Sequence, residues 1–216
     1  MLAELHAHSN HSHDGKDSVR KLLDAAINKN LGIISITDHN TVNGSMEAKE
    51  IVDSEHLSII VLPGVEISAL EGHLLAYGVS QDFEKGMPMR ETAKLVKNAG
   101  GVAAVAHPFQ VHRHGVLRLS KVIDAVDAVE VFNAKFYIGF CNRLANYFAT
   151  KYQKSSIAGS DAHCSGAIGH GITSFYNARD AATALNDICC GNTEIFGKRI
   201  PLAIQLESLK AKFGVA

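Results

Sequence analysis

Histidines and carboxylates recur along this chain at the ends of short apolar runs. The chain has 12 histidines among 216 residues, and six separated segments each place such a side chain where a strand would give way to a loop. Imidazole nitrogens and carboxylate oxygens both bind divalent transition metals. The candidate ligands are His6, His8, Asp14, His39, Glu66, His73, His107, Asp161 and His163. This pattern predicts a metal site that holds more than one ion.

The spacing inside the motifs indicates how such ions would be shared. His6 and His8 are separated by one residue, and side chains two apart on a strand point to the same face, so both can bind one ion. Asp161 and His163 repeat that spacing. A carboxylate has two oxygens and can bridge two ions about 3.5–4 Å apart. Because it is a lone glutamate among histidines, Glu66 is the expected bridge.

Other polar residues beside these motifs are candidates for supporting roles. Asp38 precedes His39, and we expect it to orient a ligand through a hydrogen bond. Arg113 lies in a polar loop and is predicted to make a two-pronged contact with a phosphate, the alternative being a solvated loop arginine. Lys135 and Asn133, just beyond a strand end, are further candidates for substrate binding.

Strand-like and helix-like segments alternate along the chain and would position these residues. Strands are expected at 2–5, 33–37, 58–62, 65–67, 73–79, 102–106, 128–132 and 156–159, with a strand-like end at 195–197. Helices are expected at 18–30 with Ser18 as the N-cap, and at 45–53, 88–99, 138–152 and 179–189. Alternation favours a parallel α/β fold, and functional groups at six or more strand ends favour a closed barrel over an open sheet.

Composition limits the functional classes. The chain is 46% hydrophobic and 20% charged with a formal charge of -1, which is typical of a globular enzyme and argues against extended duplex binding. A signal peptide is not indicated, and no apolar run reaches the ~18 residues of a membrane span. We therefore expect a cytoplasmic protein without a membrane partner, folded as one domain over residues 1–216, with the motifs in 1–175 and a closing helix and tail in 176–216. The oligomeric state stays open.

In their order, the motifs resemble those of the polymerase and histidinol phosphatase (PHP) superfamily. The matching segments are Glu4-Leu5-His6-Ala7-His8-Ser9 through Asp14-Gly15, Ile36-Thr37-Asp38-His39-Asn40-Thr41, Gly64-Val65-Glu66-Ile67-Ser68, His73-Leu74-Leu75-Ala76-Tyr77-Gly78, Ala106-His107-Pro108 and Gly159-Ser160-Asp161-Ala162-His163. The resemblance implies a distorted (β/α)7, TIM-like barrel with two or three divalent ions at its C-terminal rim. Glu4 stands where many members have aspartate, in an outer-shell position.

The resemblance also implies a distribution of ligands among the ions. One ion would be held by His6, His8, Glu66 and Asp161, a second by Glu66, His73 and His107, and a third by Asp14, His39 and His163. Mixed imidazole and carboxylate ligands suit zinc, manganese and iron alike, so the metal stays open.

Such ions would activate a metal-bound water for attack on a phosphate ester. His163 or His107 would be candidate proton donors to the leaving group if not fully engaged as ligands. The main prediction is therefore a metal-dependent phosphoesterase acting on a small phosphomonoester or a nucleotide. A 3'-5' exonuclease or phosphodiesterase acting on single-stranded nucleic-acid ends is the first alternative. The second is a non-catalytic barrel subunit of a ribonucleoprotein, which need not keep a full ligand set.

Overall fold

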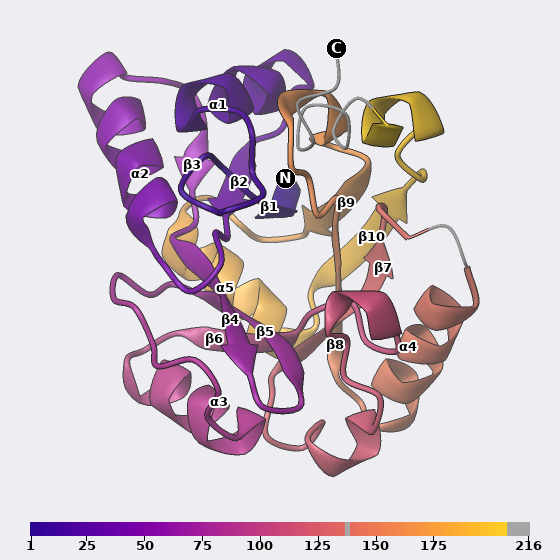
Figure 1. Ribbon diagram of the computed structural model, residues 1–216. Helices are drawn as coiled ribbons and strands as arrows, with labels where there is room; N and C mark the ends of the chain where they lie inside the picture. The colour runs from indigo at the N-terminus through magenta and orange to yellow at the C-terminus, as the bar shows by residue number, and fades with distance from the viewer. Residues whose placement is uncertain (137–138, 207–216) are drawn as a thin grey trace.

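The computed structural model describes residues 1–136 and 139–206 (Figure 1). The helices are α1 (Val19–Asn28), α2 (Asn43–Glu55), α3 (Met89–Asn98), α4 (Gly139–Lys151) and α5 (Ala181–Cys190), with short 3₁₀ helices η1 (Val111–Arg113), η2 (Leu119–Lys121) and η3 (Ser165–Ala167). The expected helix start at Ile138 and the tail residues 207–216 lie outside the described residues. The prediction of one domain over the whole chain stays a prediction.

The strands form two mixed sheets of five strands each. They are β1 (Leu2–Ala7), β2 (Ile33–Ile36), β3 (Ile60–Val61), β4 (Gly64–Ala69), β5 (Gly72–Tyr77), β6 (Val102–Val105), β7 (Ala128–Asn133), β8 (Ser155–Gly159), β9 (Gly171–Phe175) and β10 (Thr193–Gly197). One sheet has the order β10-β9-β1-β2-β3 and the other the order β4-β5-β6-β7-β8. Antiparallel pairs occur in both sheets, at β1–β9 and β9–β10 and at β4–β5 and β5–β6.

The expected closed barrel is therefore wrong. Within the described residues, no ladder joins β3 to β4 or β8 to β10, so each sheet has two edges. On the β8 side, threonine hydroxyls of β9 and β10 instead form hydrogen bonds with backbone groups of β8. The Thr173 hydroxyl accepts from the Ala158 amide at 2.9 Å and donates to the Ala158 carbonyl at 2.9 Å. The Thr193 hydroxyl donates to the Ser156 carbonyl at 2.8 Å.

At each of the two junctions, within the described residues, the sheets meet by one isolated backbone bridge rather than a ladder. His39 bridges to Glu66, and Ala7 bridges to Ala162. In the first bridge the Asn40 amide donates to the Glu66 carbonyl at 2.8 Å. Both bridges involve the segments that carry candidate ligands, so the sheets come together at the site itself.

Apolar side chains pack between the sheets and their covering helices. Figure 1 shows α1 and α2 beside β2 and β3, with α3 beside the β4–β6 region and α4 next to β7 and β8. As expected, Ser18 caps α1, and its side chain accepts from the Lys21 amide. The buried face of that helix consists of Val19, Leu22, Leu23 and Ala26. None of the helices in residues 1–136 and 139–206 has the length and apolarity needed to cross a membrane.

Candidate metal centre

The nine candidate ligands come together although they lie on six separate segments of the chain. His6 is in β1 and His8 follows it, His39 follows β2, Glu66 is in β4 and His73 is in β5. Because β5 runs antiparallel to β4, the start of β5 lies beside the end of β4, and Ser68 pairs with His73. Four groups have ligand atoms within 4.8 Å of one another: His8, Asp14, His39 and His163; His6, Glu66 and His107; His6, His8 and Asp161; His39, Glu66 and His73. Three of these groups cross the boundaries of the three expected ligand sets, whereas His6, His8 and Asp161 fall within the first set.

Glu66 lies at the middle of the cluster and is 1% exposed. Its Oε1 atom is 2.9 Å from His73 Nδ1 and 3.0 Å from His107 Nε2. Its Oε2 atom is 3.1 Å from His39 Nδ1 and 3.4 Å from His8 Nε2. Burial would raise the pKa of Glu66, but the surrounding histidines outweigh burial and hold the pKa well below its usual range. Each carboxylate oxygen thus faces a different set of imidazoles, as a bridging ligand requires.

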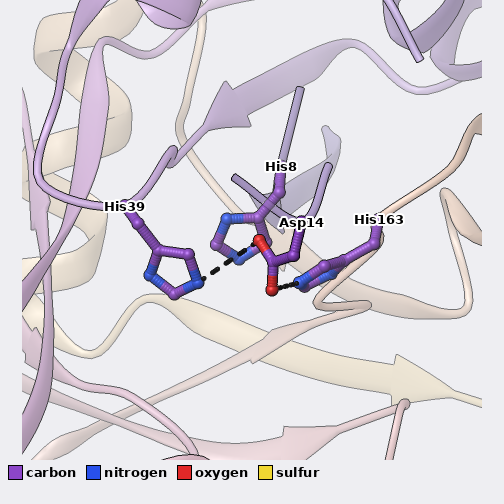
Figure 2. Close-up of side chains that lie close together, drawn as sticks. All are labelled: His8, Asp14, His39 and His163. Atoms are coloured by element: carbon purple, nitrogen blue, oxygen red, sulfur yellow. Dashed lines mark hydrogen bonds and ion pairs between the residues drawn. The ribbon is translucent and has the colours of Figure 1, made fainter. Parts of the chain in front are cut away.

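Asp14 joins the outer part of the cluster, and Figure 2 shows it between His39 and His163, with His8 behind. Its carboxylate oxygens lie 3.0 Å from His163 Nε2 and 3.7 Å from His39 Nε2. The Asp14 side chain is 18% exposed, whereas His8 is fully buried. Burial acts to raise the pKa of Asp14, but hydrogen bonds to the two histidines outweigh it and hold the pKa far below its usual range. This group is the most solvent-accessible part of the cluster.

Asp161 is fully buried and contacts all three of the expected substrate-binding residues. Arg113 Nη1 forms an ion pair with its Oδ2 atom, and the Asn133 side-chain amide donates to the same atom at 3.0 Å. Lys135 Nζ lies 3.5 Å from Oδ1 and 2.9 Å from His163 Nδ1. Burial lowers the pKa of Lys135 to about 8. The side chains of Arg113 and Lys135 are 21% and 26% exposed, so both reach solvent, whereas Asn133 is fully buried.

Several buried nitrogen and oxygen atoms of the cluster have no hydrogen-bond partner within the described residues, and their positions indicate whether the cluster fits divalent ions. Among the described residues these include His6 Nε2, His8 Nε2, His107 Nδ1 and Asp14 Oδ1. A buried polar atom without a partner costs about 1–3 kcal/mol. The two Nε2 atoms lie 3.5 and 3.4 Å from oxygens of Glu66. Unpartnered nitrogens facing carboxylate oxygens are what a transition metal would satisfy, so the donor set fits metal binding.

The two expected outer residues each fix a ligand-bearing segment. Glu4 is buried and accepts hydrogen bonds from the backbone amides of His6, Ser160 and Gly169 at 3.1, 2.9 and 2.8 Å. Burial raises the pKa of Glu4 to about 7, although these hydrogen bonds act in the opposite direction. Its contacts tie β1 to the segment that follows β8.

Asp38 acts through Ser12, which sequence reasoning missed. The Ser12 hydroxyl donates to Asp38 Oδ1 at 2.8 Å, lies 3.3 Å from His8 Nδ1 and accepts from the His39 amide at 2.9 Å. Asp38 therefore contacts neither imidazole directly. Ser12 is 5% exposed and carries no motif signal of its own, because serine is common in polar loops.

Glu130 is a second residue that sequence reasoning left without a role. It lies in β7, is 1% exposed, and its Oε1 atom is 3.0 Å from His6 Nδ1. The available signal was a charged residue inside the apolar run Ala128–Phe132, since a charge in a buried strand is seldom kept without a partner.

A cavity of about 730 Å³ opens over the cluster. Its lining is rich in basic and imidazole groups and has one carboxylate; the residues are His11, His13, Asp14, His39, Asn40, Ser68, His73, Lys85, His112, Arg113, His114 and Lys135. A second cavity of about 440 Å³ adjoins it and shares Ser68, His73 and His114. The second cavity is walled by the exposed leucines Leu70 and Leu117. The arrangement can accept an anionic group over the cluster and a larger, partly apolar group beside it.

The expected family is confirmed by comparison with known proteins. Residues 4–205 match the PHP domain model, and the chain belongs to this family. An uncharacterized protein of Methanocaldococcus jannaschii is 33% identical over 156 residues, which covers 67% of this chain and 89% of that protein.

Two further similarities place the family match in a chemical context. The phosphoribosyl 1,2-cyclic phosphate 1,2-diphosphodiesterase of Eggerthella lenta is 33% identical over 137 residues, covering 62% of this chain and 47% of that enzyme. A two-domain protein of Bacteroides vulgatus, which contains a predicted PHP-like metal-dependent phosphoesterase, has a TM-score of 0.75 at 18% identity. That match covers 92% of this chain and 65% of the other, so it shows a shared fold over part of the Bacteroides protein.

Proposed function

We propose that this protein is a metal-dependent phosphoesterase that hydrolyses a small phosphomonoester or a nucleotide. One observation carries the proposal: the buried carboxylate of Glu66 is surrounded by five imidazoles beneath a cavity lined by cationic side chains. The Eggerthella relative, which acts on a phosphate diester by its name, supports the same class of chemistry.

The ligands would be the nine residues named from the sequence, with Glu66 shared between ions. Divalent ions bound there would supply Lewis acidity and lower the pKa of a coordinated water, so that no serine or cysteine nucleophile is required. Two or three ions of zinc, manganese or iron satisfy this donor set.

The chain's own side chains would position the substrate. Arg113 and Lys135 both reach the cavity and both contact Asp161, so a phosphate placed over the cluster would lie within reach of two cations. His163 is 6% exposed and Lys135 Nζ lies 2.9 Å from its Nδ1 atom, which places a proton-carrying group at the edge of the cavity. His107 is 1% exposed and faces Glu66, so of the two expected proton donors His163 is better placed to reach a leaving group.

The adjoining cavity is the place where the alcohol part of the ester would lie. Its shared wall means that a substrate bound over the cluster could extend toward Leu70 and Leu117. This favours an ester whose alcohol part is larger than a simple sugar, such as a nucleoside.

The test is a panel of phosphate esters assayed on protein of known metal content. The protein is stripped with a chelator, and zinc, manganese or iron(II) is restored in turn. The panel contains nucleoside monophosphates, sugar phosphates, a cyclic ribose phosphate, an aryl phosphodiester and a single-stranded oligonucleotide. We expect phosphate release from monoesters only after a metal is restored. Absence of hydrolysis across the whole panel with every metal would reject the proposal, and preferred cleavage of the oligonucleotide from an end would favour the exonuclease.

A further inference from the structure

We propose that Glu130 is a positioning residue that fixes three metal ligands from three different strands at once. The inference rests on the metal site of the proposed function, but it concerns how the chain itself holds that site. Glu130 lies in β7, between the strands that lead to His107 and to Asp161. It lines neither of the two cavities over the cluster, so it acts through its neighbours rather than on a substrate.

The first contact sets which nitrogen of His6 is available for a metal. Glu130 Oε1 is 3.0 Å from His6 Nδ1, and both side chains are fully buried. The other oxygen of Glu130 accepts two N–H donors, and we assign the same accepting role to Oε1, which puts the proton of His6 on Nδ1. The lone pair then lies on Nε2, which has no hydrogen-bond partner among the described residues and lies 3.5 Å from Glu66 Oε1. A carboxylate behind a metal-binding histidine selects the tautomer and orientation in this way.

The second oxygen holds the other two ligands. Glu130 Oε2 accepts from the His107 backbone amide at 2.7 Å and from the Asn133 side-chain amide at 3.1 Å. His107 has a φ of 27°, in the left-handed region that non-glycine residues seldom adopt, so its backbone needs such support. The Asn133 amide also donates to Asp161 Oδ2 at 3.0 Å, which extends the network to the segment after β8.

The surrounding backbone is shaped to allow this contact. At Gly159 a Cβ atom would lie 2.4 Å from His6 Cβ and 2.8 Å from Glu130 Oε1, so a side chain there would push the pair apart. The register of β7 against β8 shifts between Glu130 and Phe132. Such irregularities re-aim the side chains beside them. Glycine and the register shift both occur where the carboxylate meets the imidazole.

The test uses Glu130→Gln, with Glu194→Gln on exposed β10 as the matched control. Glutamine keeps the size but has one acceptor oxygen, so it cannot accept at both His6 and His107. We expect affinity for at least one ion, measured by chelator competition without substrate, to fall about 10–100-fold. The control should retain wild-type affinity. An affinity in Glu130→Gln equal to that of the control would overturn the proposal.

A second measurement does not depend on the variant folding. In zinc-loaded wild-type protein, long-range proton–nitrogen NMR spectra report which ring nitrogen of His6 carries the proton. We expect the proton on Nδ1 and the metal on Nε2, whereas the reverse would overturn the proposal even if the variant is unstable. Neither readout requires phosphoesterase activity, so a protein that shows both results and cleaves no ester in the panel would retain the role of Glu130 while losing the proposed function.

Discussion

Replacement of Glu66 by glutamine tests the centre of the site, and the contacts of Glu66 set the size of the effect. Three imidazole nitrogens lie within 3.1 Å of its oxygens, those of His73 and His107 on Oε1 and that of His39 on Oε2. An interaction with a charged group contributes about 1.5–3 kcal/mol. Glutamine has a single acceptor oxygen, so it can keep either the two contacts made by Oε1 or the one contact made by Oε2.

The substitution therefore removes one or two of these interactions, together with the negative charge. Bound ions would take the place of these contacts, so the loss for metal binding is that of one charged ligand oxygen, about 1.5–3 kcal/mol, which corresponds to about 10-fold to 150-fold in the affinity of the most weakly held ion. We expect Glu66→Gln to lose at least one metal equivalent on dialysis and to lose phosphate release, with secondary structure little changed.

The assay combines elemental analysis after dialysis, chelator competition for the dissociation constant, circular dichroism and phosphate release. Glu91→Gln, an exposed glutamate in the first turn of α3, is the matched control. A Glu66→Gln protein with wild-type stoichiometry, affinity and turnover would show that this carboxylate does not bridge ions. A loss of the circular dichroism signal of the folded protein would instead show that the substitution acts mainly by destabilising the fold.

Further predictions concern the ions, Asp161, Arg113 and a carboxylate remote from the site. Chelation should lower the melting temperature by about 8–16 °C when free metal had been about 1,000 times its dissociation constant, and an unchanged scan would contradict binding of ions to the folded state. Asp161→Asn should reduce metal content and phosphate release as Glu66→Gln does, whereas Glu4→Gln should be milder, by the same two assays. Arg113→Ala should lower kcat/KM about 10–100-fold with metal content unchanged, and Arg113→Lys should recover part of the loss. Wild-type kinetics in both variants would limit Arg113 to its ion pair with Asp161 and exclude a contact with the substrate. Burial acts to raise the pKa of Asp187, but hydrogen bonds from Asn177 outweigh burial and lower the pKa. The ionised side chain of Asp187 therefore stabilises the folded protein at pH values above its unfolded pKa of about 3.9. This stabilisation is lost as the pH falls through the lower pKa of the folded state. Urea titrations of metal-free Asp187→Asn and wild type should accordingly differ at neutral pH, and the difference should shrink below about pH 4 and vanish below the lowered folded pKa of Asp187.

The candidate site was more predictable from the sequence than the sheets that carry it. The alternation of His6 and His8 fixes a shared face for any strand, whatever the strand pairs with. The strand β9 was missed because its hydropathy is misleading: Ile172 is partly exposed, while Thr173 is fully buried and uses its hydroxyl on Ala158. A pattern of apolar side chains does not record such a contact, so neither β9 nor its antiparallel pairing with β1 and β10 could be inferred.

Glu130 and Ser12 were missed for a different reason. Their roles depend on partners 124 and 26 residues away, His6 and Asp38 respectively. Sequence spacing predicts which side chains share one strand face or one helix face, but it contains no information on which strand lies beside which. Outer contacts of this kind become visible only when the strand order is known.

The absence of a closed ladder has a consequence for how the ligands act. His6, His8 and His39 belong to or follow strands of the first sheet, whereas Glu66, His73, His107, Asp161 and His163 belong to or follow strands of the second. Ions bound to this set would connect the two sheets where the backbone contributes the isolated bridges His39–Glu66 and Ala7–Ala162. Binding free energy would then stabilise the junction of the sheets as well as the site. The melting temperature should for this reason respond to chelation more strongly than to removal of a single surface contact, and opening of the metal-free protein should begin at this junction, where hydrogen exchange at the Asn40 and Glu66 amides would report it.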